Sequence, residues 1–504
     1  MAEKRRKIEL YGRLGGKSGW KAKDIEAARR KFADGALEEV RTVIRVHKAW
    51  MVMLAQQGVV EKKRGAAILR ALCEAETDAG FAEMVENFEP DHPKPIYQVE
   101  DYLLNHVGPE GSDVMIGRTI PPPFYRLALR EALLDLVVAT LDFRSELLKL
   151  AEKHVQTVMP GYTHMQHAQP TTFGHYLMSL YDAIDRASGQ VESAYAQTNV
   201  CDLGCGACSG TSFDIDRMLP ARLLGFDGIQ ENANDCVAST DHAVDAVCAC
   251  TNLMIPLGRV GNELDVWHSF EFNMVEVADD IAAPSSMMPQ KKNPAVFEYA
   301  RMRTGHIAAC YTDIVTMAHG IPYGDICDIK EITMRVCPAV RDAATALRNM
   351  KEVFAGLIVK EPVMRERAGA GFSTASELAA TLYREADIPL RLAHGVVAEV
   401  VRRVWQDGGL AMEITTDLVD EAAQHVVGRP ARLSNESLAR ALAPTAFVEA
   451  HTSQGGVAPS EVTRMIGERR KDLTLARGRH AGRVGRLQRA GDELAQAVAG
   501  LIAE

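Results

Sequence analysis

The sequence predicts an all-α protein with three helical domains and a long central helix bundle. Two observations predict this fold class: apolar residues recur at helical spacing over long stretches, and strand-like alternation is almost absent. The longest predicted helices, about 25 to 40 residues, exceed the usual globular length and must bury two or more faces. We therefore expect the bundle to form an oligomer.

The clearest helix follows the triple proline at residues 121–123. Six apolar residues and one threonine step by four and three residues in alternation, which places them on one seam. These positions are Leu129, Leu133, Leu136, Thr140, Phe143, Leu147 and Leu150.

A second apolar stretch runs from about Ala238 to Ala278 without strand punctuation. A third helix should run from Pro294 to about Met317, because Asn is a favoured N-cap and Pro a favoured first helical residue. In this interpretation Asn293 caps the helix, and the helix N-terminus faces the preceding loop. We expect an N-terminal helical domain over 1–120, the central bundle over 121–362 and a C-terminal helical domain over 363–504.

Composition narrows the possible partners of the 504-residue chain. Hydrophobic residues make up 47% and the net charge is −10, so a large core is expected and general binding to nucleic acid or an acidic membrane is not. Residues 1–10 lack the apolar core of a signal peptide, and no run of about 18 apolar residues occurs. We expect a cytoplasmic protein with a small-molecule ligand.

The ten cysteines are too sparse for a disulfide scaffold, and reduced thiols are expected. Cys201, Cys205 and Cys208 nevertheless have the C-x3-C-x2-C spacing of a four-iron cluster in radical enzymes. Such clusters usually lie above a barrel of parallel strands, which this sequence does not predict. A radical enzyme therefore remains a weak alternative.

The segment Ala283 to Pro294 reads APSSMMPQKKNP and leads directly into a predicted helix. Backbone N–H groups and the positive end of the helix dipole favour an anion there, and Lys291 or Lys292 adds a full positive charge. A carboxylate substrate fits this loop. A simple polar loop with an N-cap is the structural alternative.

A second unusual segment, MPGYTHMQHAQPTT, runs from Met159 to Thr172 and is predicted to be a loop. It gathers two histidines, His164 and His167, with two amides, which favours a functional role. The H-x2-H spacing has no Glu or Cys partner in a recognised pattern, so a zinc site is disfavoured and no metal is expected.

These two segments resemble the argininosuccinate lyase branch of the fumarase/aspartase superfamily. The superfamily loop GSS-x-MP-x-K-x-NP is similar to Pro284–Pro294 of this sequence, with Pro284 in place of the usual Gly. The branch is indicated by Gly161–Pro170, GYTHMQHAQP, and by Gly371–Val397. The stretch Cys201–Arg217 is similar to a family loop in which ordinary residues replace the cysteines.

The resemblance implies a reversible anti-elimination that releases fumarate from an N-substituted aspartate, without a cofactor. Loss of the proton next to a carboxylate creates a second negative charge, which needs fixed positive groups. By resemblance, Ser285 is the base, while Lys291 and Asn293 stabilise the aci-carboxylate. His164, partnered by Glu298, would donate or relay a proton to the leaving nitrogen.

The resemblance also implies substrate-binding residues and an assembly. Thr163 would bind a substrate carboxylate beside His164. The active site of the family combines the regions of His164, residues 238–241 and Ser285 from three subunits of a homotetramer. We expect the same tetramer here.

Three segments depart from the argininosuccinate lyase pattern. The S-R-N-D motif is replaced by residues 117–122, where Arg118 and Thr119 stand in for the carboxylate contacts. The S-D-R-D motif is replaced by residues 238–241, which leaves Ser239 as a candidate contact. In the amine-end motif Tyr323 and Lys330 persist, but Cys327 replaces the glutamine that holds the amino acid.

The elimination half of the site is thus retained, whereas the leaving-group half is changed. We expect a C–N lyase acting on an N-succinyl amine such as ethylenediamine-disuccinate, with true argininosuccinate lyase as the alternative. A cycloisomerase or an adenylosuccinate lyase fits Gly161–Pro170 less well. A non-enzymatic relative such as a lens crystallin is expected to have lost His164 or Ser285, and both are present.

Overall fold

The computed structural model describes residues 25–89, 94–119, 123–324 and 327–504. The predictions made for residues 1–10, for the first two residues of the triple proline and for Ile120 lie outside these described residues. The same holds for positions 325 and 326 of the amine-end motif.

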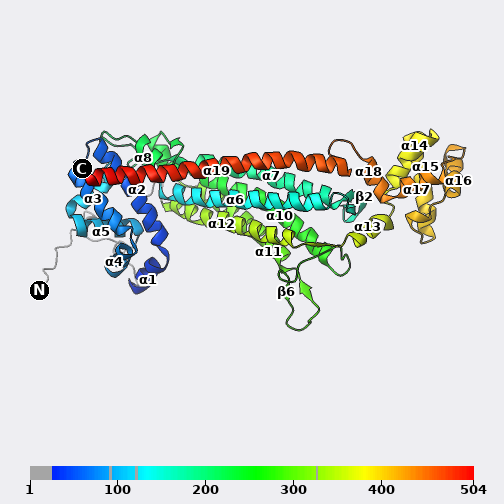
Figure 1. Ribbon diagram of the computed structural model, residues 1–504, viewed down its shortest axis with the longest axis horizontal. Coiled ribbons are helices and arrows are strands. Elements are labelled where there is room, and N and C mark those ends of the chain that lie inside the picture. Colours follow the sequence, from blue (N-terminus) through cyan, green and yellow to red (C-terminus); the bar gives the residue numbers. More distant parts are fainter. Residues whose placement is uncertain (1–24, 90–93, 120–122, 325–326) are drawn as a thin grey trace.

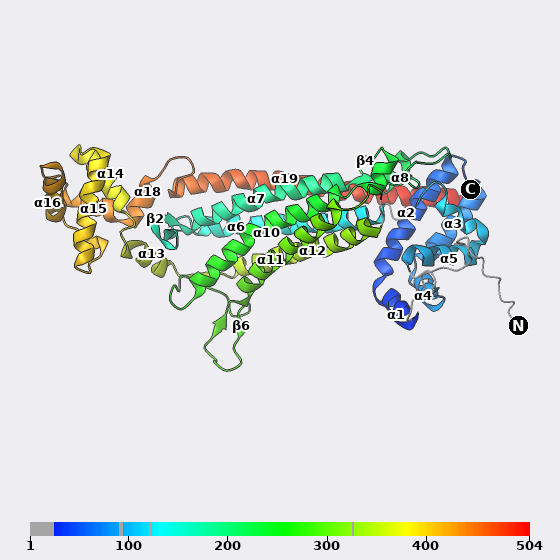
Figure 2. The same ribbon diagram turned by 180° about the vertical axis from the view of Figure 1, so that it is seen from behind.

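The centre of the molecule is a bundle of long helices that lie side by side in both views (Figures 1 and 2). The all-α prediction is confirmed. The bundle consists of α6 (Phe124–Lys153), α7 (Phe173–Thr198), α10 (Asp241–His268), α11 (Ala295–His319) and α12 (Cys327–Ala355).

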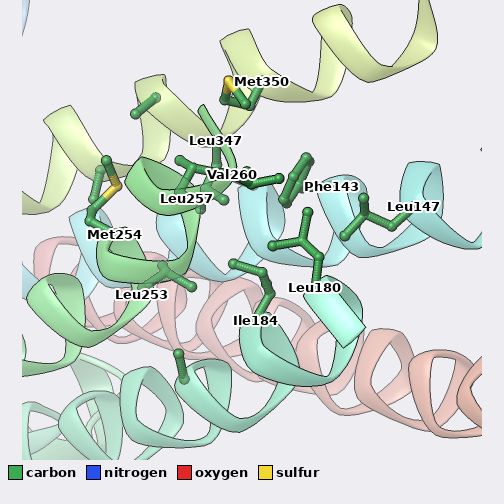
Figure 3. Packing of buried hydrophobic residues seen from close by; sticks show 14 of the residues in the cluster. Phe143, Leu147, Leu180, Ile184, Leu253, Met254, Leu257, Val260, Leu347 and Met350 are labelled. Atoms are coloured by element: carbon green, nitrogen blue, oxygen red, sulfur yellow. The ribbon is translucent and has the colours of Figure 1, made fainter. Parts of the chain in front are cut away.

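The seam predicted for α6 is buried at all seven positions. Figure 3 shows Phe143 and Leu147 close to side chains of α7, α10 and α12, among them Leu180, Leu257 and Leu347. Full burial of such a side chain stabilises the fold by about 1.5–3 kcal/mol, so this seam holds the bundle together.

Two helix boundaries differ from the predictions. The stretch from Ala238 to Ala278 is helical only over α10, since the chain turns at Ser269 and enters a short strand. Asn293 does not cap α11: Pro294 occupies the cap position, and the Asn293 amide donates a hydrogen bond to the Ala283 carbonyl (3.1 Å). That amide therefore ties two loop strands together instead of accepting a helix N–H.

The N-terminal body packs around the fully buried Trp50. It consists of α1 (Ile25–Gly35), α2 (Leu37–Gln56), α3 (Lys62–Ala75), α4 (Asp78–Glu86), α5 (Pro95–Val107) and the 3-10 helix η1 (Pro109–Met115). The short helix α8 (Met218–Leu223) adds to the same core.

The C-terminal body has a hydrophobic cluster of its own. The chain enters it through α13 (Glu361–Ala370), and it continues with α14 (Ala375–Ala386), α15 (Leu390–Gln406), η2 (Ala411–Glu413), α16 (Thr416–Val427), α17 (Asn435–Leu442) and α18 (Pro444–Ala450). The last helix, α19 (Pro459–Ala503), returns along α6 to the N-terminal body (Figure 1). It places Val462 in the bundle core and Leu494 in the N-terminal core. The domain boundaries proposed from the sequence remain a prediction.

Short strand pairs connect the helices. They are β1 (Val158–Thr163) with β2 (Gln166–Thr172), β3 (Val200–Cys201) with β4 (Gly228–Ile229), β5 (Val275–Glu276) with β8 (Ile358–Val359), and β6 (Ala283–Pro284) with β7 (Lys292–Asn293). Only β3–β4 is parallel among these four pairs of the described chain. The prediction of a loop over Met159–Thr172 was wrong, because this segment is the β1–β2 hairpin.

One helix of the described ranges, α10, is long and apolar enough to cross a membrane by length and composition alone. It packs against α7, α11 and α12 in the middle of the bundle. Its apolar composition is therefore explained by burial in the protein core.

Candidate active site

The β1–β2 hairpin presents His164 at its turn. Thr163 pairs with Gln166, and the two residues between them, His164 and Met165, have φ of 54° and 59°. A two-residue turn with two positive φ angles normally contains Asn or Gly, so the backbone here is strained. Thr163 and His164 are both exposed. The hairpin turn therefore presents the predicted histidine at an exposed position.

His167 has a different environment from His164. Its ring lies 5.3 Å from that of Tyr162, and burial together with Arg367 lowers its pKa. In the described part of the chain, no three His, Cys, Asp or Glu side chains are grouped as a metal site. His167 is also exposed, and its ring lies against Gly371, where an added Cβ would be 3.0 Å from its Nδ1.

Ser285 lies at the start of the loop between β6 and β7, which projects from the bundle (Figures 1 and 2). Its Oγ accepts hydrogen bonds from the backbone N–H of Met288 (3.0 Å) and of Met287 (3.4 Å). Two N–H donors directed at one hydroxyl oxygen favour negative charge on that oxygen. This geometry suits a serine that acts as a base.

The two neighbouring lysines of this loop differ. The Lys292 amine binds the carboxylates of Glu276 (2.5 Å) and Asp279 (2.6 Å), and these hydrogen bonds raise its pKa. Lys291 is exposed, as is Glu298 in the first turn of α11. Lys291 is therefore the better placed of the two to meet a ligand, as the resemblance implies.

Arg118 is buried beside the N-terminal body. Its Nη1 lies 2.9 Å from Nδ1 of His47, and its guanidinium lies 5.7 Å from the Phe124 ring centroid. Burial lowers its pKa to about 10, and within the described residues its Nε and Nη2 have no hydrogen-bond partner. Buried N–H groups without an acceptor are costly, so Arg118 is a candidate donor to an anion; the charge of Glu100 also acts on it and raises its pKa. Thr119 follows and is half-buried.

Ser239 follows the short helix α9 (Ala233–Ala238) and belongs to a hydrogen-bond network that sequence reasoning missed. Its Oγ accepts from Arg126 Nη2 (3.3 Å) and from Gln230 Nε2 (3.0 Å). Arg126 is buried and ion-paired with Asp202 (3.3 Å). The available signal was an arginine on the same helix face, three residues before the first seam position Leu129, because a buried charge requires partners.

Tyr323 and Lys330 lie near opposite ends of the amine-end motif. The Tyr323 hydroxyl donates to Asp235 Oδ1 (2.8 Å). Lys330 is half-buried on α12 and acts electrostatically on Lys94 and Glu39. Burial and then the Lys330 charge lower the pKa of Lys94. The two lysines thus bring positive charge to the same place.

The three cysteines with iron-cluster spacing do not form one group. Cys201 is buried in the N-terminal core, whereas Cys205 and the more exposed Cys208 pack with Cys236. Cys236 accepts a hydrogen bond from Arg217 (3.3 Å). This division weakens the iron-cluster alternative.

The predicted site residues fall into three separate places in one chain (Figures 1 and 2). His164 and Thr163 lie at one end of the bundle near α13, and the Ser285 loop projects from its side. The remaining candidates are Arg118, Thr119, Ser239, Tyr323 and Lys330. Arg118 contacts His47 of α2, Tyr323 contacts Asp235 of α9, and Lys330 acts electrostatically on Lys94. The tetramer expected from the resemblance would bring such places together.

The bundle leaves large apolar side chains exposed. The apolar side chains of Tyr299, Met302 and Met334 on α11 and α12 are 60%, 55% and 54% exposed. Exposed apolar side chains on adjacent long helices are typical of an interface between subunits.

Comparison with known proteins gives two family matches and close relatives. Residues 25–308 match a family described as "Lyase", and residues 372–449 match the argininosuccinate lyase C-terminal family. The argininosuccinate lyase of Methanosarcina barkeri is 35% identical over 441 residues, which are 86% of this chain and 87% of that protein. The argininosuccinate lyase of Methanothermobacter thermautotrophicus is 34% identical over 84% of this chain and 90% of its own length.

This chain is also similar to solved structures of lyases. A variant of EDDS lyase with bound fumarate superimposes with a TM-score of 0.85 at 29% identity, covering 96% of this chain and 97% of that chain. EDDS lyase in complex with formate gives a TM-score of 0.84 at 28% identity with the same coverage. A fumarate lyase from a Mesorhizobium species gives 0.71 at 18% identity, with 91% and 99% coverage, which shows the fold alone.

Proposed function

This chain belongs to the argininosuccinate lyase branch of the fumarase/aspartase superfamily and is a fumarate-releasing carbon–nitrogen lyase, and we propose that it acts on an N-succinyl amine other than argininosuccinate. Ethylenediamine-disuccinate and related aminocarboxylates are the favoured substrates. True argininosuccinate lyase activity is the second candidate, and the names of the relatives favour it.

The observation that carries the chemistry is the environment of Ser285. Its oxygen receives two backbone N–H groups, and the exposed Lys291 follows in the same loop. Ser285 would remove the proton next to the substrate carboxylate. Lys291 and the second amide hydrogen of Asn293 would stabilise the doubly charged aci-carboxylate that results.

The leaving nitrogen needs a proton as the carbon–nitrogen bond breaks. We assign this role to His164 of the β1–β2 hairpin, oriented by Glu298 from the first turn of α11 of another copy. The strained hairpin turn supports the assignment, since strained backbone is often found at functional sites and this turn presents His164 at an exposed position.

Substrate binding is assigned to two further sets of residues. Arg118, Thr119, Thr163 and Ser239 would bind the carboxylates of the succinyl group, and the unpaired N–H groups of buried Arg118 support this. Tyr323 and Lys330 would bind the amine end. We propose that a cytoplasmic homotetramer combines these parts from three subunits.

A screen for fumarate release tests the proposal. The purified protein is incubated with argininosuccinate, ethylenediamine-disuccinate and other N-succinyl amines, and fumarate is followed by its ultraviolet absorbance. We expect a higher kcat/KM for a substrate other than argininosuccinate, with the Ser285→Ala variant as the control. A higher kcat/KM for argininosuccinate would establish the second candidate instead.

A further inference from the structure

Tyr323 is the most exposed of the predicted amine-end contacts, yet its hydroxyl group is oriented. Its side chain is 71% exposed, and its hydroxyl hydrogen is donated to Asp235 Oδ1 at 2.8 Å. The adjoining Gly324 lies against the same region, where a Cβ would contact Cys208 and Asn234 at 3.9 and 4.0 Å. The Tyr323 segment thus packs on the α9 region.

Asp235 is itself held from the other side. Its Oδ2 accepts a hydrogen bond from Gln230 Nε2 (2.6 Å), and Gln230 Oε1 accepts one from Arg126 Nη2 (2.6 Å). Arg126 is fixed by the buried Asp202 (3.3 Å). A continuous series of hydrogen bonds therefore runs from a buried ion pair to the Tyr323 hydroxyl.

This series determines what Tyr323 can offer to a ligand. A phenol has one hydrogen, and Asp235 uses it, so only oxygen lone pairs remain for a ligand. Asp235 and Asp241 both raise the pKa of Tyr323, which keeps the phenol protonated and shows that both carboxylates act on it. An N–H donor with positive charge suits an acceptor next to two carboxylates.

We propose that Asp235 is a positioning residue that fixes the Tyr323 hydroxyl as an acceptor and thereby selects leaving amines with a cationic group. The inference rests on the proposed function, since it concerns the amine end of the same site. It adds Asp235, and Gln230 behind it, to the residues that determine specificity.

Two substrates of equal shape test the inference. N-(aminopropyl)aspartate ends in an ammonium group, and N-butylaspartate ends in a methyl group at the same position. The wild-type protein should prefer the ammonium substrate in kcat/KM by about tenfold or more, because a charge-assisted hydrogen bond is lost with the methyl group. Asp235→Asn should remove most of this preference through KM, with little change in kcat.

A double-mutant cycle separates positioning from folding. Tyr323→Phe and Asp235→Asn should each reduce the preference, and the double variant should be no worse than the stronger single variant. Asp407→Asn, an exposed carboxylate at the end of α15, is the control and should keep the wild-type preference. Thermal unfolding of each variant reports any loss of structure.

The outcomes are distinguishable. Equal loss on both substrates in Asp235→Asn, or additive effects in the double variant, would overturn the inference and leave the proposed function intact. A wild-type protein that releases fumarate equally well from both substrates would overturn it as well. Absence of fumarate release from every N-succinyl amine would overturn the proposed function and this inference together.

Discussion

The region around Tyr323 and the loop that carries Ser285 are built in opposite ways. Tyr323 is connected through Asp235, Gln230 and Arg126 to a buried ion pair. Ser285 receives hydrogen bonds only from its own loop among the described residues, and that loop projects from the bundle. The Tyr323 side is thus held by a network within one chain, and we propose that another copy completes the elimination side.

This difference has a physical reason. Recognition of an amine depends on fixed donors and acceptors, which a buried network supplies within one chain. Elimination needs a cationic site closed from water around a doubly charged intermediate. In the proposed tetramer the projecting loop would meet this need by entering a neighbouring subunit.

The largest expected effect comes from removal of the Ser285 hydroxyl. Ser285→Ala should reduce kcat by about a thousandfold or more, because the proposed base is lost. The melting temperature should stay near the wild-type value, since a loop hydroxyl contributes little packing. Steady-state kinetics and calorimetry measure the two quantities. Near-normal turnover would exclude Ser285 as the base.

Complementation between inactive variants tests whether subunits share the site. Ser285→Ala and His164→Asn should each be inactive alone. Co-expression should restore part of the activity, because some mixed tetramers place a native Ser285 loop against a native His164 hairpin.

Ser285→Ala co-expressed with Lys291→Ala is the matched control. Both residues lie in one loop, so no mixed site contains a fully native loop and no activity should return. Recovery in this control, or none in the Ser285 and His164 mixture, would contradict a site of the proposed composition.

Substitutions of the two neighbouring lysines, Lys291 and Lys292, should lower kcat/KM to different extents. Lys291→Ala should lower kcat/KM by about a hundredfold or more, since a positive group at the developing carboxylate is removed. Lys292→Ala should change kcat/KM by about tenfold or less, because its amine is engaged by Glu276 and Asp279. Equal losses of kcat/KM in both variants would show that activity depends on the net charge of the loop and not on the position of Lys291.

The sequence predicted the regular parts of this molecule better than the irregular ones. The α6 seam could be predicted because burial of one helix face requires apolar residues at helical spacing. The β1–β2 hairpin could not, because its turn contains His164 and Met165 instead of the Asn-Gly pair that signals such turns.

The candidate site was also predicted only in part from the sequence. The motifs gave Tyr323 and Ser239, but Asp235 and Gln230 became visible only when folding placed residues from distant segments in contact. The cap predicted at Asn293 failed because its amide bonds Ala283 across a strand pair that no local pattern indicates.

The smallest predicted effect concerns His242, which lies next to the network on α10. Burial, with a smaller contribution from Arg126, lowers its pKa to about 4, well below the usual value of 6.5. The unfolded chain therefore binds this proton more readily. Neutral His242 should therefore contribute fully to stability above pH 6.5. The free energy of unfolding should fall by up to about 3 kcal/mol as the pH falls from 6.5 to about 4.

Denaturant unfolding of the wild-type protein and of His242→Gln across this pH range measures the effect. The variant lacks the titrating group, so its stability should fall less steeply between pH 6.5 and about 4. Parallel curves would show that His242 is not held neutral in the folded state. The buried network would then tolerate a positive charge beside Arg126, and the contrast between a rigid amine side and an exposed elimination side would lose its electrostatic basis.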